Sequence, residues 1–203
     1  MNEVSPGQEP FAGCGPPPCA VANDPNDERQ RAGETGVVVL SAPLGAGAWD
    51  MIRAFIAKTS PDDLRLRFGQ PLDFRNDATL KRCFDIDGET GEMLLALDEG
   101  GAIAGILHRV RVSPCEAEIA LIVRSDCKRQ GVGKRLLRAA LRRAATQRLP
   151  KLRAMILREN IPMLRLARKF GLLPQRAAGL SVEVEFDLAA CASLREVLPA
   201  HAA

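Results

Sequence analysis

The sequence contains no tyrosine, and aromatic residues make up only 4% of its 203 residues. Few aromatic side chains leave little surface for stacking bases, which argues against nucleic acid as the ligand. No apolar run approaches the ~20 residues that a membrane-spanning helix needs. The first residues, MNEVSPGQEP, have neither the basic start nor the apolar core of a secretory signal. These absences predict a cytoplasmic protein with no membrane partner.

Residue types that commonly bind metals are also sparse. The two histidines are His108 and His201, and none of the six cysteines forms a Cys-x-x-Cys pair. Because zinc-binding spacing is absent, we predict no metal site, and we expect free thiols in a reducing cytoplasm. Cys127, beside Lys128 and Arg129, is the thiol whose pKa nearby cations are expected to lower.

The strongest local signal lies between residues 116 and 147. An apolar strand pattern from Glu118 to Val123 leads through a polar, basic loop to two glycines, Gly131 and Gly133, and then into an amphipathic helix. Glycines let the backbone approach a ligand closely, and the first N–H groups of a helix have no partner within it. The helix dipole adds partial positive charge at the same place. Such a turn suits a pyrophosphate.

Two common pyrophosphate motifs fit poorly. A Walker motif needs four residues between its glycines and a Ser or Thr after the lysine, whereas here one residue separates the glycines and Arg135 follows Lys134. A dinucleotide fingerprint needs a third glycine where Leu136 stands.

The stretch Lys128-Arg129-Gln130-Gly131-Val132-Gly133 resembles motif A of the GNAT acetyltransferase superfamily, Arg/Gln-x-x-Gly-x-Gly/Ala, with lysine at the first position. The resemblance implies that this loop binds the pyrophosphate of acetyl-CoA. It also implies that the end of the preceding strand separates from the next strand and offers backbone groups to the pantetheine arm and the thioester. Acetyl-CoA is therefore the expected cosubstrate.

The segment that begins at Asn160 resembles motif B of the same superfamily. Ala167 occupies the position of the usual tyrosine general acid, and Leu172 replaces a phenylalanine. A chain without tyrosine must release the CoA thiolate in another way, and a thiol with a pKa of about 8.5 is a tolerable leaving group. The cofactor-binding residues that the two motifs imply are Leu121, Ile122, Val123, Lys128, Arg129, Gln130, Gly131, Val132, Gly133, Lys134 and Asn160.

Three stretches are most similar to the Pat-type bacterial protein lysine acetyltransferases. They run from Ser60 to Phe68, from Ala117 to Asp126, and from Glu159 to Leu164. This closer resemblance implies that the acceptor is a protein with an exposed lysine.

The predicted elements follow the order of a GNAT domain: a strand, two or three helices, three antiparallel strands, a helix, a strand, a helix and two strands. The predicted fold class is α/β (α+β), with a mixed, mostly antiparallel twisted sheet of about seven strands flanked by helices. Residues 1–35 are expected to form a disordered tail, residues 36–188 the acetyltransferase domain, and residues 189–203 a C-terminal tail. The expected strands are 37–40, 92–98, 102–112, 116–123, 151–157, one from residue 172 onward, and 180–187, and the expected helices are 48–58, one starting at Ser60, 76–84, 131–147 and 160–170.

Acetyl transfer to an amine requires a neutral nitrogen, and only roughly 0.1% of a free lysine is neutral near pH 7.5. A general base is therefore needed. Glu118 is the leading candidate, because it is an acid within an otherwise apolar strand, where alternate residues share a face. Glu116 and His108 are weaker candidates. Cys127 would be the nucleophile of a ping-pong alternative, which we disfavour because no histidine lies near it in sequence.

The sequence thus predicts an acetyltransferase that moves the acetyl group of acetyl-CoA to an amine, with a protein lysine as the expected acceptor. Two alternatives stay open. One is a GNAT enzyme that acts on a small-molecule amine. The other is a non-catalytic module that senses CoA or binds nucleic acid, which the basic residues between 128 and 158 would favour.

Overall fold

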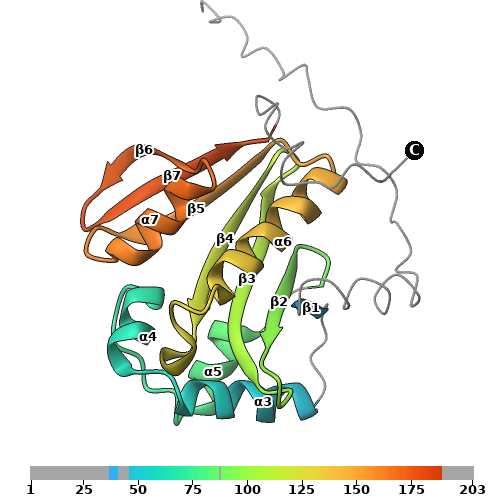
Figure 1. The fold of residues 1–203 in the computed structure, drawn as a ribbon, viewed down its shortest axis with the longest axis vertical. Coiled ribbons are helices and arrows are strands. Elements are labelled where there is room, and N and C mark those ends of the chain that lie inside the picture. The colour runs from blue at the N-terminus through green and yellow to red at the C-terminus, as the bar shows by residue number, and fades with distance from the viewer. Residues whose placement is uncertain (1–36, 41–45, 87, 189–203) are drawn as a thin grey trace, which may run out of the picture.

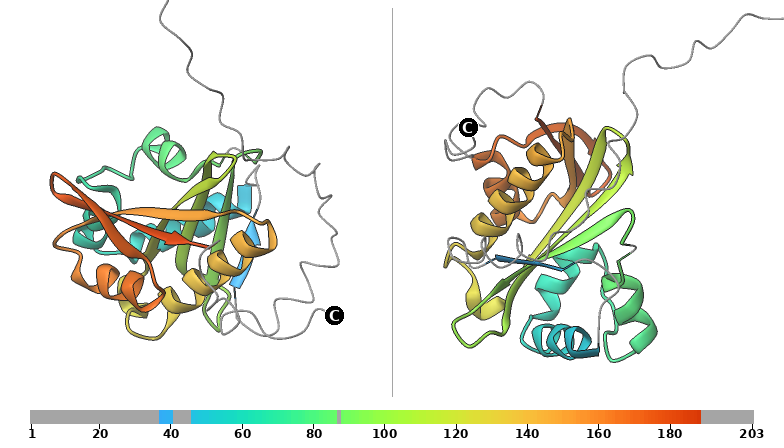
Figure 2. Two further views of the ribbon diagram at one scale, coloured as in Figure 1. Left: turned by 90° about the horizontal axis from the view of Figure 1, so that it is seen from above. Right: turned by 90° about the vertical axis from the view of Figure 1, so that its right-hand side faces the viewer.

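A computed structural model describes residues 37–40, 46–86 and 88–188. The predicted tails, 1–35 and 189–203, lie outside these ranges. The described part contains a sheet of seven strands with helices on both faces (Figures 1 and 2). The strand order is β1-β2-β3-β4-β5-β7-β6. Only β4 and β5 are parallel neighbours, which confirms the predicted mixed, mostly antiparallel sheet.

The strands begin and end within a few residues of the predicted positions. Short turns join β2 to β3 and β3 to β4, so these strands form an antiparallel meander. The strand bounds are β1 Val37–Leu40, β2 Gly91–Leu97, β3 Ile103–Ser113, β4 Glu116–Val123, β5 Lys151–Leu157, β6 Leu173–Ala178 and β7 Ser181–Asp187.

Three helices begin after a residue whose side chain caps them: Ser60, Asn76 and Asn160. Ser60 caps α4, where its hydroxyl oxygen accepts a hydrogen bond of 3.2 Å from the Asp63 N–H. At the end of α7, Gly171 has a φ of 80°, which glycine adopts without strain, and it closes the helix as predicted. The helix bounds are α3 Ala46–Ala57, α4 Pro61–Phe68, α5 Asp77–Phe84, the short 3₁₀ helix η1 Ser125–Cys127, α6 Val132–Thr146 and α7 Ile161–Lys169.

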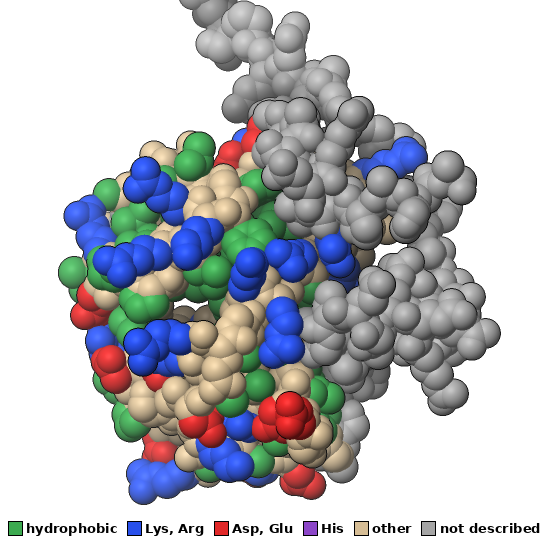
Figure 3. Space-filling view, viewed as in Figure 1, with side chains coloured by type: hydrophobic (Ala, Val, Ile, Leu, Met, Phe, Trp, Pro, Cys, Tyr) green, Lys and Arg blue, Asp and Glu red, His purple; other side chains and the backbone are tan. Residues whose placement is uncertain are grey.

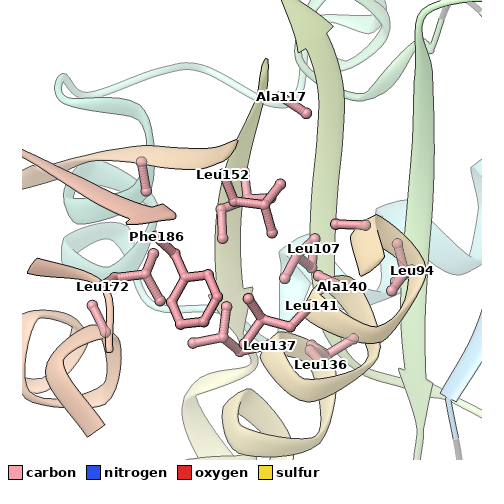
Figure 4. Packing of buried hydrophobic residues seen from close by; sticks show 14 of the residues in the cluster. Leu94, Leu107, Ala117, Leu136, Leu137, Ala140, Leu141, Leu152, Leu172 and Phe186 are labelled. Carbon is pink, nitrogen blue, oxygen red and sulfur yellow. The ribbon is translucent and has the colours of Figure 1, made fainter. Parts of the chain in front are cut away.

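The helix α6 packs lengthwise on one face of the sheet (Figure 4). Its apolar stripe has helical spacing and is fully buried, as predicted. The stripe meets side chains from β2, β3, β4 and β5, including Leu94, Leu107, Ala117 and Leu152. The buried stripe residues are Val132, Leu136, Leu137, Ala140, Leu141 and Ala144.

A second core lies on the opposite face, beneath α3 and α5. Ile52 and Phe55 of α3 and Leu80 and Phe84 of α5 pack there against the sheet. Because neighbouring residues of a strand point to opposite faces, β4 presents Ile119 to the α6 side and Ile122 to the α3 side. Glu118 shares the face of Ile122.

The cysteines are only partly as expected. Cys83 and Cys127 are free thiols, whereas Cys115 is disulfide-bonded, so the expectation of free thiols is wrong for Cys115. The spacing of cysteines along the chain does not reveal which of them approach each other in the fold. Within the described ranges, no helix is both long and apolar enough to cross a bilayer.

Candidate active site

The parallel strands β4 and β5 separate along their length. They pair only at Glu116–Lys151, Ala117–Leu152 and Glu118–Arg153. Both strands continue for several residues, to Val123 and Leu157, without pairing to each other. Backbone groups of β4 that would bond a neighbouring strand therefore face an opening. The resemblance to the family predicted this separation.

A cavity of about 940 Å³ occupies the opening. It extends from the ends of β4 and α4 to the start of α6 and to α7. Figure 1 shows α7 opposite α4. All the predicted cofactor-binding residues line the cavity except Gln130. The Gln130 side chain instead donates a hydrogen bond of 3.0 Å to the Asp126 carbonyl. The lining residues that the sequence predicted are Leu121, Ile122, Val123, Lys128, Arg129, Gly131, Val132, Gly133, Lys134 and Asn160.

Two glycines shape the loop at one end of the cavity. Gly131 has a φ of 82° and immediately precedes α6, which no side chain caps. The first N–H groups of α6 therefore stay available to an anion. A Cβ on Gly133 would lie 3.1 Å from the Leu166 side chain and 3.3 Å from that of Leu121. Gly133 thus permits the close approach of α6 to β4 and α7.

Lys128 is held by an ion pair. Its ammonium contacts the Asp63 carboxylate of α4, which also accepts a hydrogen bond of 2.6 Å from the Ser125 hydroxyl. Burial raises the pKa of Asp63, but hydrogen bonds with the side chains of Lys128, Ser125 and Ser60 outweigh it and lower the pKa overall. A phosphate that bound Lys128 would share this cation with Asp63. The contact also joins α4 to the loop before α6.

Further cations surround the mouth of the cavity. Arg138 lies one turn after Lys134 on α6, and Arg165 and Lys169 lie one turn apart on α7. Figure 3 shows Lys and Arg side chains gathered around a hollow that is partly lined with apolar side chains. We did not predict these three residues, although their spacing of four residues indicates a shared helix face. Their charges suit a ligand with several phosphates.

Asn160 serves the local structure as well as the cavity. Its side-chain oxygen accepts a hydrogen bond of 3.2 Å from the Met163 N–H and so caps α7. Ala167, at the position of the family's tyrosine, is fully buried and does not line the cavity. The methyl group of Ala167 therefore does not reach the cavity in which we expect the thiolate to depart.

Glu118 stands at the last paired position before the strands separate, on the side of the sheet that faces α4. Its side chain is 40% exposed and lies outside the residues that line the cavity. Arg153 of β5 lies 3.4 Å from the carboxylates of both Glu118 and Glu116. Glu118 is thus less enclosed than an acid of an apolar strand was expected to be, and it lies beside an arginine of the neighbouring strand.

His108 cannot act as a base in this environment. Burial, together with the nearby Arg67 cation, lowers its pKa to about 3. A guanidinium only donates hydrogen bonds, so the Arg67 contact of 3.2 Å to Nδ1 fixes Nδ1 as the acceptor and places the ring proton on Nε2. The lone pair that would take a proton from a substrate is therefore already engaged.

Cys127 lines the cavity but is a poor nucleophile. Its side chain is buried, and burial raises the pKa of the thiol despite the nearby Arg124 cation. The expectation that neighbouring cations lower this pKa is therefore wrong, because burial outweighs them. A thiol of this kind holds little thiolate at neutral pH.

Comparison with known proteins agrees with this geometry. The family model described as the acetyltransferase (GNAT) family matches residues 56–172. The chain belongs to this family, whose members are N-acetyltransferases that use acetyl-CoA.

Two solved structures illustrate the similarity. The GNAT domain of S. lividans PAT is 22% identical, with a TM-score of 0.66, covering 75% of this chain and 90% of that chain. The spermidine N-acetyltransferase from Vibrio cholerae, solved in complex with CoA and spermine, is 15% identical, with a TM-score of 0.59, covering 76% of this chain and 96% of that chain. At these identities the two structures support the fold alone.

Proposed function

We propose that this protein transfers the acetyl group of acetyl-CoA directly to a protein lysine, with Glu118 as the general base. The observation that carries the proposal is the opening between β4 and β5 beyond Glu118–Arg153. At one end of this opening lie the free N–H groups at the start of α6 and a cationic rim, which consists of Lys134, Arg138, Arg165 and Lys169. At its other end lies the end of β4, with unpaired backbone groups. The loop and rim suit the phosphates of CoA, and the strand end suits its pantetheine arm and thioester.

In the proposed reaction, the lysine nitrogen attacks the thioester carbonyl carbon while Glu118, directly or through water, accepts a proton from the amine. The C–N bond forms, the C–S bond breaks, and the CoA thiolate leaves with the electron pair. No acetyl-enzyme forms, in keeping with the raised pKa of the Cys127 thiol. Unpaired N–H groups of β4 are placed to bond the carbonyl oxygen as it gains negative charge.

The acceptor side is open to solvent. Glu118 is 40% exposed, and Met155, farther along the neighbouring strand, is 46% exposed. A lysine on a flexible segment can therefore reach Glu118 from outside, opposite the cofactor. The motifs similar to Pat-type enzymes support the same acceptor class.

The first experiment is calorimetric titration with acetyl-CoA, with ATP as the control ligand. We expect acetyl-CoA to bind and ATP to bind much more weakly, because ATP lacks the pantetheine arm. In the variant Gly131→Asp, a carboxylate at a φ of 82° would face the bound pyrophosphate, so we expect acetyl-CoA affinity to fall at least about tenfold. Equal affinity in this variant would contradict the assignment of the loop.

The acceptor is tested by supplying acetyl-CoA with a lysine-containing protein or peptide, with spermidine, or with neither. Transfer to protein lysine would support the proposal. Transfer to spermidine alone would replace the protein acceptor by a small amine, and binding without transfer to either would leave a CoA-binding module.

A further inference from the structure

Arg67 of α4 is a cation in the wall of the cavity that makes no ion pair with any described acidic residue. Its side chain donates to His108 Nδ1, at 3.2 Å, and its guanidinium carbon lies 4.7 Å from the centre of the Phe68 ring. Both partners are neutral. Burial lowers the pKa of Arg67 to about 10, although the influence of Cys83 and Glu118 opposes the shift.

The other enclosed arginines behave differently. Arg109 and Arg124 are buried, and each holds a carboxylate: Arg109 contacts Glu92 at 2.7 Å, and Arg124 contacts Asp126 at 2.7 Å and Asp98 at 2.9 Å. Burying a cation without an opposite charge is unfavourable. Arg67 therefore has N–H donors that remain unused and a positive charge without a paired carboxylate, at the edge of an open cavity. A guanidinium in this state is suited to bind the carboxylate of a ligand.

The position of Arg67 relates it to the reacting group. His108 pairs across the sheet with Ala120 of β4. Ala120 lies midway between Glu118 and Ile122, and all three residues are on the same face of the strand. Ile122 lines the cavity where the thioester is proposed to lie, about 7 Å along the strand from Ala120. A carboxylate three C–C bonds from the thioester carbonyl extends about 4 Å from it. An acyl chain directed along β4 toward Glu118 thus brings that carboxylate within reach of the guanidinium.

We propose that Arg67 receives the distal carboxylate of a dicarboxylic acyl group, so that the enzyme accepts four-carbon acyl-CoA substrates of the succinyl type in addition to acetyl-CoA. This inference rests on the proposed acyl transfer. A lysine acceptor supplies no carboxylate near its nitrogen, since four methylenes separate its amine from an uncharged backbone. We therefore assign the carboxylate to the acyl donor.

The reaction is the one proposed above with a different acyl group. The amine attacks the thioester carbonyl carbon of succinyl-CoA, the C–N bond forms, and the CoA thiolate leaves with the electron pair of the C–S bond. The amine proton passes to Glu118. The distal carboxylate stays unchanged, and its pairing with Arg67 fixes the direction of the chain.

The test compares kcat/KM for succinyl-CoA with that for butyryl-CoA, which has the same chain length but a methyl group in place of the carboxylate, on one lysine peptide. We expect the wild-type protein to prefer succinyl-CoA and Arg67→Met to lose about tenfold or more of that preference. Arg67→Lys keeps the charge without the two-pronged geometry and should lose less. Arg65→Met is the matched control, because Arg65 lies on the same helix but pairs with Asp62 and Glu159. Its preference should equal that of the wild type.

Each other outcome has a distinct meaning. An unchanged preference in Arg67→Met would overturn the inference while leaving acetyl transfer intact. If Arg67→Met instead impairs acetylation of free lysine but not of cadaverine, the carboxylate comes from the acceptor, and the acyl-group assignment is wrong. If no acyl group is transferred at all, the proposed function fails. The ratio of calorimetric affinities for succinyl-CoA and butyryl-CoA, in wild type and Arg67→Lys, then still decides whether Arg67 binds a carboxylate.

Discussion

At the scale of single residues, a comparison of Glu118 with Glu116 distinguishes a role in proton transfer from a role in the ion pair with Arg153. Both carboxylates lie 3.4 Å from Arg153, and both are on the same face of β4. Only Glu118 stands at the last position before the strands open. Any role in proton transfer should therefore belong to Glu118, whereas the ion pair with Arg153 is common to both.

We expect Glu118→Gln to lower kcat for lysine acetylation about 100-fold near neutral pH while leaving acetyl-CoA affinity unchanged. The defect should shrink as pH rises, because hydroxide then supplies the neutral amine. The measurement is the pH profile of kcat beside that of Glu116→Gln, which should resemble the wild type. Equal losses in the two variants would show that the Arg153 ion pair, not a base, was removed.

The low pKa of His108 predicts that the stability of the folded protein depends on pH. Its pKa is about 3 in the folded protein against 6.5 for an ordinary histidine, because of burial and Arg67. Well above pH 6.5 the imidazole is neutral in both the folded and the unfolded state. Below that value the unfolded chain binds a proton that the folded protein does not bind until about pH 3, so the free energy of unfolding falls as pH falls.

Between about pH 7 and pH 5, this histidine alone should cost about 2 kcal/mol of stability. The variant His108→Gln keeps an oxygen that can accept from Arg67 and removes the titration. Urea unfolding of both proteins at several pH values checks this expectation. Parallel curves for the two proteins would mean that the pKa of His108 is the same in the folded and unfolded states.

At the scale of elements, close contact between β3 and α6 positions the cofactor loop. A Cβ on Gly105 of β3 would lie 2.8 Å from the Val132 side chain, 3.0 Å from that of Leu136 and 3.2 Å from the Ile122 carbonyl oxygen. The side chains can shift, but the backbone oxygen cannot do so without moving β4. Gly105 therefore sets the distance between the sheet and the first turn of α6.

We expect Gly105→Ala to lower the free energy of unfolding by about 1–3 kcal/mol and to weaken acetyl-CoA binding as the start of α6 moves. Gly47→Ala is the control, because no atom lies within 4 Å of a Cβ there and alanine favours the helix. Thermal unfolding and calorimetry measure the two effects. If Gly105→Ala is as stable as Gly47→Ala, the contact is looser than the distances indicate.

The elements themselves were largely predictable from the sequence, for reasons that differ among them. The stripe of α6 repeats at helical spacing, and Ser60 and Asn160 mark helix starts by the local chemistry of their side chains.

The separation of β4 from β5 was expected only through family resemblance, because no local pattern shows where two strands stop pairing. The ion pair of Lys128 with Asp63, 65 residues apart, and the contact of Arg67 with His108, 41 residues apart, depend on the packing of α4 against β4. Sequence spacing carries no signal for either contact.

At the scale of the whole molecule, a modest net charge of +3 conceals a strong local excess of cations. Acidic side chains neutralise many basic residues elsewhere, as in the pairs Arg53–Asp77 and Arg176–Glu183. Around the cavity mouth, α6 and α7 present Lys134, Arg138, Arg165 and Lys169 together (Figure 3). This asymmetry suits a small polyanion that enters one cleft.

Acetyl-CoA affinity should therefore depend on salt through these particular cations. The screening length shortens from more than 10 Å to less than 8 Å when salt is raised from about 0.05 M to about 0.5 M, so we expect the dissociation constant to rise several-fold over that range. Arg165→Gln should weaken binding at low salt and reduce this salt dependence. Arg168→Gln should do neither, because Arg168 is also exposed on α7 but does not line the cavity. Calorimetry at the two salt concentrations distinguishes the variants. If both behave alike, affinity depends on the overall charge of the protein, and the cationic rim has no specific part in holding the phosphates.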